Sequence, residues 1–105
     1  MFLKLKDIPA KEILPGFHGK FIHSEKFTTT FWEIEAGAEL PEHHHFHEQT
    51  SQVVEGELEF TLEGETQILK PGDFVVIPSN AIHSGKALTF CKVIDVFCPV
   101  REEYK

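Results

Sequence analysis

The chain has 105 residues, of which 41% are hydrophobic, and a formal net charge of -7. This length suits one compact domain spanning residues 1–105, with enough apolar side chains for a real core. The chain has no apolar run of about 18 residues, which argues against a membrane span, and its acidity argues against a nucleic-acid partner. Charged residues lie where a signal peptide needs an apolar core, so we expect a cytoplasmic protein.

The predicted secondary structure is all-β. Residues 1–15 contain Pro9 and Pro15 with little periodicity, and we expect them to cover a sheet edge or to reach a partner subunit. Short β-like runs follow at 17–23, 27–34, 40–47, 57–62, 66–69, 74–77 and 88–97, with turn residues between them. Many short strands at regular spacing indicate an antiparallel sandwich or small barrel, with its core at about 17–98.

The clearest alternation lies at residues 57–62, where Leu58, Phe60 and Leu62 are expected to point inward. Glu63-Gly64 is a tight-hairpin signal, and residues 70–73 (Lys-Pro-Gly-Asp) form a second strong turn. His83-Ser84-Gly85 is expected to mark another corner. No helix longer than one or two turns is expected.

Four of the seven histidines lie within residues 43–47. If this segment is extended, four side chains share one face (His43, His45, His47 and Gln49), while His44 and Glu48 lie on the other. Imidazoles that converge from one face can ligate a borderline metal ion. The alternative is a solvated polar loop with incidental metal affinity. For the remote histidines, His18 and His23, we expect only surface or packing roles.

The spacing of these residues resembles the cupin superfamily. The first cupin motif matches Gly37, His43, His45, Gln49 and Gly56, and the second matches Gly72, Pro78, Asn80 and His83. The resemblance covers roughly residues 35 to 100 and implies a double-stranded β-helix, or jelly-roll barrel, that is often a homodimer. It also implies one metal ion held by His43, His45, Gln49 and His83, with His83 supplied by a separate hairpin.

Gln49 stands where many cupins carry Glu. A neutral amide leaves the metal charge uncompensated, which makes the ion a stronger Lewis acid and leaves no carboxylate base among its ligands. Nitrogen and amide-oxygen ligation suits Zn, Ni, Mn or Fe, and the sequence does not distinguish between these divalent ions. His47 is either an alternative ligand or a donor that supports the ligands.

The last predicted strand carries candidate acid/base and anion-binding groups. By alternation, Cys91, Val93, Asp95 and Phe97 share one face, although the opposite register would expose Asp95. A carboxylate facing the metal cavity could act as a general acid or base. Arg101 is the only Arg in the chain and could bind a substrate carboxylate, or it could be a surface residue. The two cysteines, Cys91 and Cys98, are expected to be reduced packing residues.

This C-terminal sequence and the pattern at 43–49 are similar to those of KdgF-type pectin-degradation cupins. The resemblance implies that the metal-bound protein converts 4,5-unsaturated uronates to linear keto forms, with a small sugar acid as its partner. It assigns the acid/base and carboxylate-binding roles to Asp95 and Arg101, and an aromatic wall of the sugar site to Phe97.

Two other functions are compatible with the same residues. Three His ligands with open positions could hold Fe(II) and bind O₂, as in a dioxygenase. The barrel could instead be a non-enzymatic sugar- or metal-binding module. Oxygen uptake distinguishes the first alternative, and tight binding without turnover distinguishes the second.

Overall fold

The computed structural model describes residues 1–105 and contains ten strands and two short 3-10 helices. The elements are η1 (Leu5–Asp7), β1 (Lys11–Leu14), β2 (Phe17–His23), β3 (Thr28–Ile34), β4 (Glu39–His43), β5 (Glu48–Glu55), β6 (Leu58–Leu62), β7 (Glu65–Leu69), β8 (Phe74–Ile77), β9 (His83–Ala87), β10 (Cys91–Cys98) and η2 (Glu102–Tyr104). None of its helices is long and apolar enough to cross a membrane.

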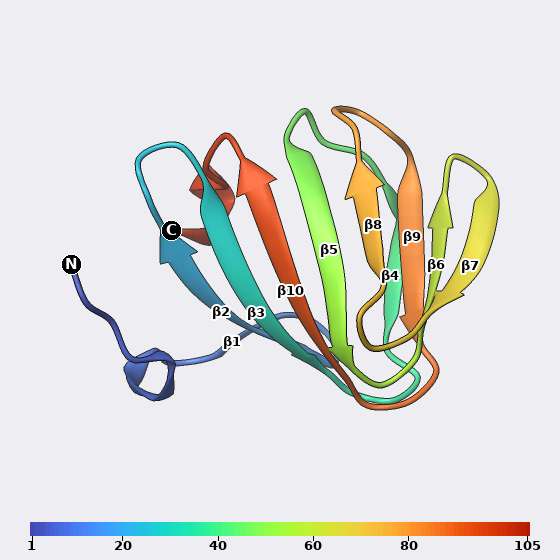
Figure 1. Cartoon of the computed structure of the whole chain (residues 1–105), viewed down its shortest axis with the longest axis horizontal. Coiled ribbons are helices and arrows are strands. Elements are labelled where there is room, and N and C mark those ends of the chain that lie inside the picture. The colour runs from blue at the N-terminus through green and yellow to red at the C-terminus, as the bar shows by residue number, and fades with distance from the viewer.

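The strands form two antiparallel sheets. One has six strands in the order β1-β2-β3-β10-β5-β8, and the other has four in the order β4-β9-β6-β7 (Figure 1). The neighbours within each sheet are mostly far apart in sequence, as in β10 between β3 and β5. This arrangement is a jelly-roll β-sandwich, which confirms the predicted fold class.

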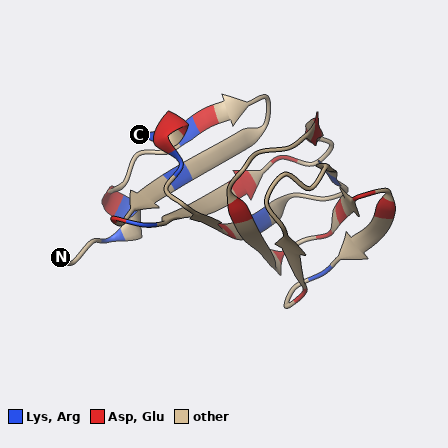
Figure 2. Cartoon of the chain, turned by 90° about the horizontal axis from the view of Figure 1, so that it is seen from above, with Lys and Arg blue, Asp and Glu red and all other residues tan.

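The core lies between the two sheets and follows from strand alternation. Twelve buried residues form one cluster, drawn from both sheets. Leu58 and Phe60 on β6 are buried there and Leu62 packs against them, as the alternating pattern predicts. Every second side chain of β10 is buried, which turns Asp95 and Phe97 inward. Acidic residues are distributed over the strands and loops of both sheets rather than gathered in one segment (Figure 2).

Several expected elements differ from the structure: no strand is predicted from the sequence where β5 lies, and the strand expected at 88–97 begins only at Cys91. The expected corner at His83-Ser84-Gly85 is wrong, because these residues begin β9 and pair with β4 on one side and β6 on the other. The strand expected at 40–47 ends at His43, and Phe46 and His47 form a bend before β5 begins. The sheet also includes β1, ahead of the expected barrel start, as an edge strand paired with β2.

Candidate metal centre and cavity

Three imidazoles converge at one end of the sandwich, between the two sheets. His43 ends β4 and pairs in register with His83, the first residue of β9, while His45 lies in the loop between β4 and β5. One ring nitrogen from each of the three lies within 4.8 Å of those of the other two. This separation suits three nitrogens that share one metal ion.

Backbone carbonyls orient all three rings. Nδ1 of His43 lies 2.9 Å from the Pro41 oxygen, Nδ1 of His45 3.1 Å from the His47 oxygen, and Nδ1 of His83 2.9 Å from the Ala81 oxygen. A carbonyl only accepts, so each Nδ1 donates its proton and each Nε2 keeps a free lone pair. Metal-bound histidines commonly have this arrangement, with the second nitrogen held by a backbone oxygen.

Burial favours the neutral form, which a metal requires, for two of the rings, those of His45 and His83. It lowers the pKa of His45 to about 4, aided by the positive charge of Arg101. Burial also lowers the pKa of His83, whose Nε2 is buried without a hydrogen-bond partner. An orphaned buried lone pair is costly in a folded protein, and a cation would satisfy it.

Gln49, the second residue of β5, completes the cluster. Its Oε1 lies 3.1 Å from Nε2 of His45, and its Nε2 donates to the Ser51 hydroxyl at 3.0 Å. Since the proton of His45 is on Nδ1, two acceptor lone pairs face each other with no proton between them. A cation near both atoms removes this repulsion, so the residues fit the metal that the sequence predicts.

His47 does not join the trio. Its ring is buried, and its Nε2 donates to the carbonyl oxygen of Val100 at 3.2 Å. The predicted alternation fails here because the bend at residues 46 and 47 interrupts the strand. His47 instead attaches the C-terminal segment to the loop that carries His45.

Asp95 lies in the same cavity and is buried. Its Oδ2 accepts a hydrogen bond from the indole Nε1 of Trp32 at 3.0 Å, while its Oδ1 has no partner. Burial raises its pKa to about 6, although the nearby polar groups of Ser51, Trp32 and Gln49 and the charge of Arg101 act in the opposite direction. A carboxyl group with such a pKa can both hold and release a proton near neutrality.

Arg101 reaches the cavity from the segment after β10. Its guanidinium carbon lies 4.7 Å from the ring centre of Phe97 and 4.5 Å from that of Tyr104, so the group lies in the corner formed by two rings that are tilted 72° to each other. Its Nε donates to the carboxylate of Glu103, and its backbone N–H donates to Thr28 Oγ1 at 2.9 Å. The side chain is only 12% exposed, which leaves it available to an anion inside the cavity rather than in bulk solvent.

The cavity thus contains the seven residues singled out from the sequence: His43, His45, Gln49, His83, Asp95, Phe97 and Arg101. Sequence reasoning missed Ser51, Trp32 and Tyr104, which also line it. For Ser51 and Trp32 a signal was present, because they share inward parity with Gln49 and with the buried Thr28 and Thr30 respectively.

The remaining candidates lie elsewhere. His18 on β2 contacts Glu35 at 2.8 Å, and His23 contacts Thr28 Oγ1 at 2.9 Å. Both cysteines are free, but the expectation of two packing residues is wrong for Cys98, which is exposed because it faces outward at the end of β10.

A model of the cupin domain matches residues 30–97, which is more than half of the chain. The chain therefore belongs to the cupin family. Pectin degradation protein KdgF from Dickeya dadantii (strain 3937) is 37% identical over 65 residues, which cover 61% of this chain and 59% of that protein. Quercetin 2,3-dioxygenase from Bacillus subtilis (strain 168) is 31% identical over 65 residues, which cover 60% of this chain but 19% of that enzyme.

Solved structures show the same relationship. KdgF from Halomonas sp. superposes with a TM-score of 0.94 and 31% identity, covering 100% of this chain and 98% of that one. A salicylate 1,2-dioxygenase variant from Pseudoaminobacter salicylatoxidans has a TM-score of 0.78 at 23% identity, covering 82% of this chain and 27% of that one. The resemblance to KdgF-type cupins is confirmed, whereas the likeness to the salicylate enzyme concerns the fold alone.

Proposed function

We propose that this cupin converts a 4,5-unsaturated uronate, or a closely related sugar acid, to its linear keto form. The observation that carries the proposal is the buried Asp95, whose unpartnered Oδ1 shares a cavity with Arg101 and the three convergent histidines. The similarity to KdgF proteins supports the same substrate class.

The metal would be held by Nε2 of His43, His45 and His83 and by Oε1 of Gln49. When bound, a divalent ion supplies Lewis-acid polarisation of a substrate oxygen. All four protein ligands are neutral, so none of them reduces its charge.

The chain's own residues would position the substrate and move its proton. Arg101 binds the carboxylate through the terminal nitrogens that Glu103 leaves free, and the ring of Phe97 walls the sugar. Asp95 takes up or delivers a proton at Oδ1. In the overall conversion a proton leaves the hemiacetal hydroxyl, the ring C–O bond breaks, and carbon 4 gains a proton. No atom is gained or lost, and no oxidant is needed.

The test is to incubate metal-loaded protein with unsaturated galacturonate and to follow the absorbance of the ring alkene. We expect the absorbance to fall faster than in buffer, and faster than with an Asp95→Asn variant loaded with the same metal. If the wild-type protein, with its metal content verified, does not exceed the buffer rate, the substrate assignment is wrong.

A dioxygenase is the second candidate, favoured by the three-histidine cluster and by the 31% identity to a quercetin 2,3-dioxygenase. Such an enzyme would consume O₂, whereas the proposed conversion consumes none. Oxygen-electrode measurements with iron-loaded protein distinguish the two. A third candidate, a non-enzymatic sugar-binding module, would bind sugar acids tightly without turning them over.

We also propose that two copies pack through the outer face of the six-stranded sheet. Two cross-strand rows cross its middle: Ile22-Thr29-Val96-Thr50-Val76 and Lys20-Phe31-Ile94-Gln52-Phe74. Nine of these ten side chains are uncharged, in a chain that is 26% charged. The solvent face of an antiparallel sheet is normally polar, so these rows suit a buried surface.

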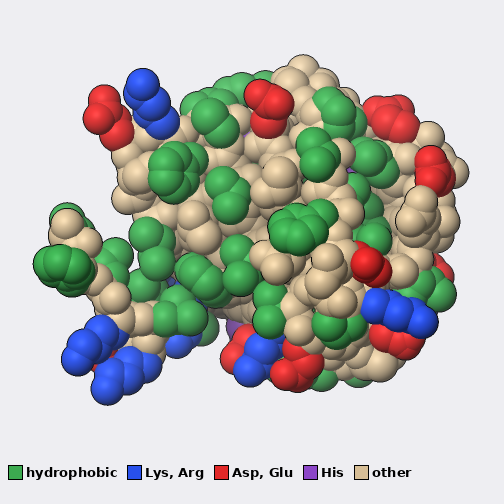
Figure 3. All heavy atoms as spheres, viewed as in Figure 1, with side chains coloured by type: hydrophobic (Ala, Val, Ile, Leu, Met, Phe, Trp, Pro, Cys, Tyr) green, Lys and Arg blue, Asp and Glu red, His purple; other side chains and the backbone are tan.

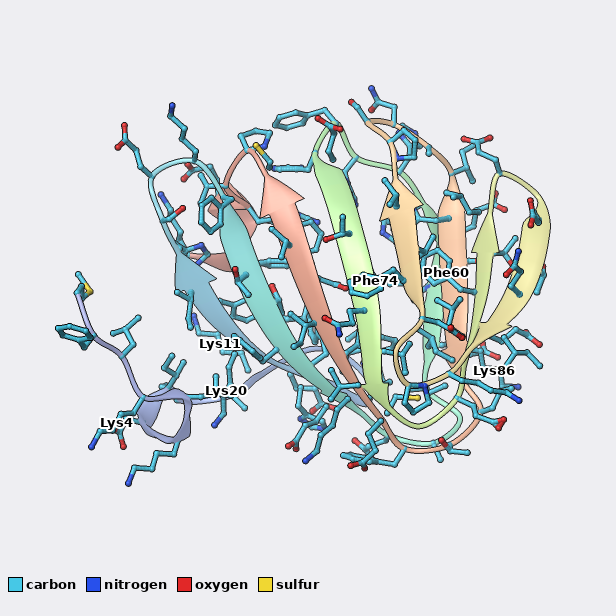
Figure 4. All side chains as sticks on the ribbon, viewed as in Figure 1. Lys4, Lys11, Lys20, Phe60, Phe74 and Lys86 are labelled. Atoms are coloured by element: carbon cyan, nitrogen blue, oxygen red, sulfur yellow. The ribbon has the colours of Figure 1, made fainter.

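A second copy is the occupant that the surrounding charges favour. Hydrophobic side chains gather over this face in Figure 3, and Phe74, labelled in Figure 4, belongs to them. The next row of the same face carries both signs, with Glu33 opposite Lys92 and Lys92 opposite Glu55. A twofold contact can therefore pair opposite charges around an apolar centre without opposing the net charge of -7 across it.

A further inference from the structure

The indole of Trp32 packs closely against a glycine of the neighbouring strand β2. Trp32 is the one Trp of the chain, lies in the middle of β3 and is 7% exposed. Its cross-strand partner on β2 is Gly19, where an added Cβ would lie 2.8 Å from the indole ring. A glycine at that point therefore makes room for the large ring, and the indole extends across the sheet to the neighbouring strand β10.

On one side, the indole nitrogen fixes the candidate acid/base. Nε1 donates to Oδ2 of Asp95 at 3.0 Å, which leaves Oδ1 as the oxygen without a partner. An indole N–H can only donate, so this contact selects one carboxylate oxygen and holds the group in one rotation. Proton transfer requires the reacting oxygen to lie within hydrogen-bond reach of the substrate, so the rotation matters.

On the other side, the indole ring supports the anion-binding arginine through Tyr104. The two ring centres lie 6.2 Å apart in an edge-to-face arrangement, and Tyr104 in turn lies 4.5 Å from the guanidinium carbon of Arg101. The backbone N–H of Tyr104 also donates to the Arg101 oxygen at 3.0 Å. Phe97 contacts the same guanidinium from a second direction, with its ring tilted 72° from that of Tyr104, so two rings restrict the position of the group.

We propose that Trp32 and Tyr104 are positioning residues: the indole N–H orients Asp95 for proton transfer, and the Tyr104 ring, supported by the indole, orients Arg101 for the substrate carboxylate. The C-terminal η2 is then part of the active site. This inference rests on the function proposed above. It also predicts that loss of the Trp32 N–H mainly lowers kcat, whereas loss of the Tyr104 ring mainly raises KM.

The first experiment compares two variants by steady-state kinetics on unsaturated galacturonate. Trp32→Phe keeps an aromatic ring but removes the N–H, and we expect kcat to fall about 10-fold or more with KM within about twofold. Tyr104→Leu removes the aromatic face behind Arg101, and we expect KM to rise about 10-fold while kcat changes little. We expect the conservative Tyr104→Phe variant to have the wild-type KM, since it retains the ring.

Phe17→Leu is the packing control. Phe17 contacts the indole edge-to-face with ring centres 6.0 Å apart and leaves the N–H in place, so its loss should lower the melting temperature with kcat retained. Equal losses of kcat in Phe17→Leu and Trp32→Phe would overturn the positioning role of the N–H. A Tyr104→Leu variant with the wild-type KM would overturn the role of its ring.

The second experiment tests the indole contact without relying on activity. Because the chain has one Trp, its indole N–H gives a single side-chain resonance in a nitrogen–proton NMR spectrum. We expect slow hydrogen exchange in the wild-type protein and exchange about 10-fold faster or more in Asp95→Ala. If exchange is equally fast in both proteins, the inference is wrong even where the enzyme is active. If wild-type protein turns over no substrate, the proposed function fails while a protected indole still establishes the contact.

Discussion

Asp95 is the residue at which burial and chemistry conflict. Its pKa is raised to about 6 in the folded chain against an ordinary value of 3.8, because burial disfavours the charged form. Above pH 6 the metal-free native state must keep a buried carboxylate ionised, whereas the unfolded chain ionises freely in water. The metal-free protein is therefore less stable at pH 8 than it would be with a neutral side chain at this position.

We predict that Asp95→Asn stabilises the metal-free protein by about 1–3 kcal/mol at pH 8, since one pKa unit corresponds to about 1.4 kcal/mol. The gain should shrink to a fraction of this value near pH 4, where the folded wild-type carboxyl is protonated and the unfolded one, with its ordinary pKa of 3.8, is about half ionised. The amide oxygen can still accept from Trp32 Nε1. Urea unfolding of both proteins at the two pH values measures the difference. A gain that does not change with pH would contradict the assigned cause.

Gln49 is the second residue whose replacement has effects that can be measured separately, on metal affinity and on turnover. In Gln49→Glu a carboxylate replaces the amide oxygen that faces His45, and negative charge attracts a divalent ion more strongly. We predict metal affinity higher by about an order of magnitude, together with slower turnover, because the added charge weakens Lewis-acid polarisation. Competition with a chelator gives the affinity, and Gln49→Ala is the control expected to lower it. Weaker binding in Gln49→Glu than in the wild-type protein would contradict this role.

At the residue scale, motif spacing located the groups now found in the cavity, but it did not locate their supports. Spacing identifies side chains that ligate or react, because such chemistry restricts residue type. Trp32 and Asp95 are 63 positions apart in sequence, and only the pairing of β3 with β10 brings them into contact. For His47, the assumed alternation predicted the same face as His43 and His45, but a local bend interrupts the strand at this point.

Among the glycines of the chain, Gly56, in the connection between β5 and β6, has the least space for a side chain. Gly56 has φ +89°, and a Cβ there would lie 2.1 Å from the carbonyl oxygen of Phe90. Gly64, in the hairpin between β6 and β7, has φ +82° with nothing within 4 Å of the added atom. The two glycines therefore have similar positive φ angles but differ in the space that a side chain would find around them.

We predict that Gly56→Ala lowers the free energy of unfolding by at least about 2–3 kcal/mol, because backbone at the β10 start must move. Gly64→Ala, the matched control, should cost only about 1 kcal/mol, the conformational part alone. Thermal and urea unfolding of the two variants give both numbers. Equal losses would mean that the close approach to Phe90 carries no energetic weight.

Strands with clear alternation or strong turn residues could be predicted from the sequence, and β2 and β8 have the predicted bounds. The misassigned element, residues 83–85, has turn-like composition but is paired on both sides in the four-stranded sheet. Its strand state comes from β4 and β6 rather than from its own propensity. Pairing between distant strands is the information that local composition lacks.

For the whole molecule, the division of ten strands into sheets of six and four follows from long-range pairing, and no local pattern encodes it. The resemblance to cupins nevertheless predicted the jelly roll, because motif spacing carries the fold of the family with it. Motif spacing could not show which side chains lie on the outer face once the strands are divided between two sheets. The uncharged rows on β10, β5 and β8 become neighbours only once the sheet is assembled.

The proposed dimer is tested by placing a charge in the middle of those rows. Val96 and Val76 are both exposed in the isolated chain, at 37% and 66%, and lie in the same cross-strand row. We predict that Val96→Glu or Val76→Lys weakens self-association at least about 10-fold, because two like charges would face each other near the twofold axis without solvent. Light scattering over a concentration series measures the effect.

Ile68 supplies the control, since it is 49% exposed but lies on β7, in the other sheet. Ile68→Lys should leave the dimer intact, and a wild-type protein that remains monomeric at all concentrations would refute the proposed surface. The proposed metal ligands, Asp95 and Arg101 all come from one chain and line the cavity between the sheets, away from this surface. A Val96→Glu monomer should therefore turn over substrate at the wild-type rate per chain, which separates assembly from chemistry.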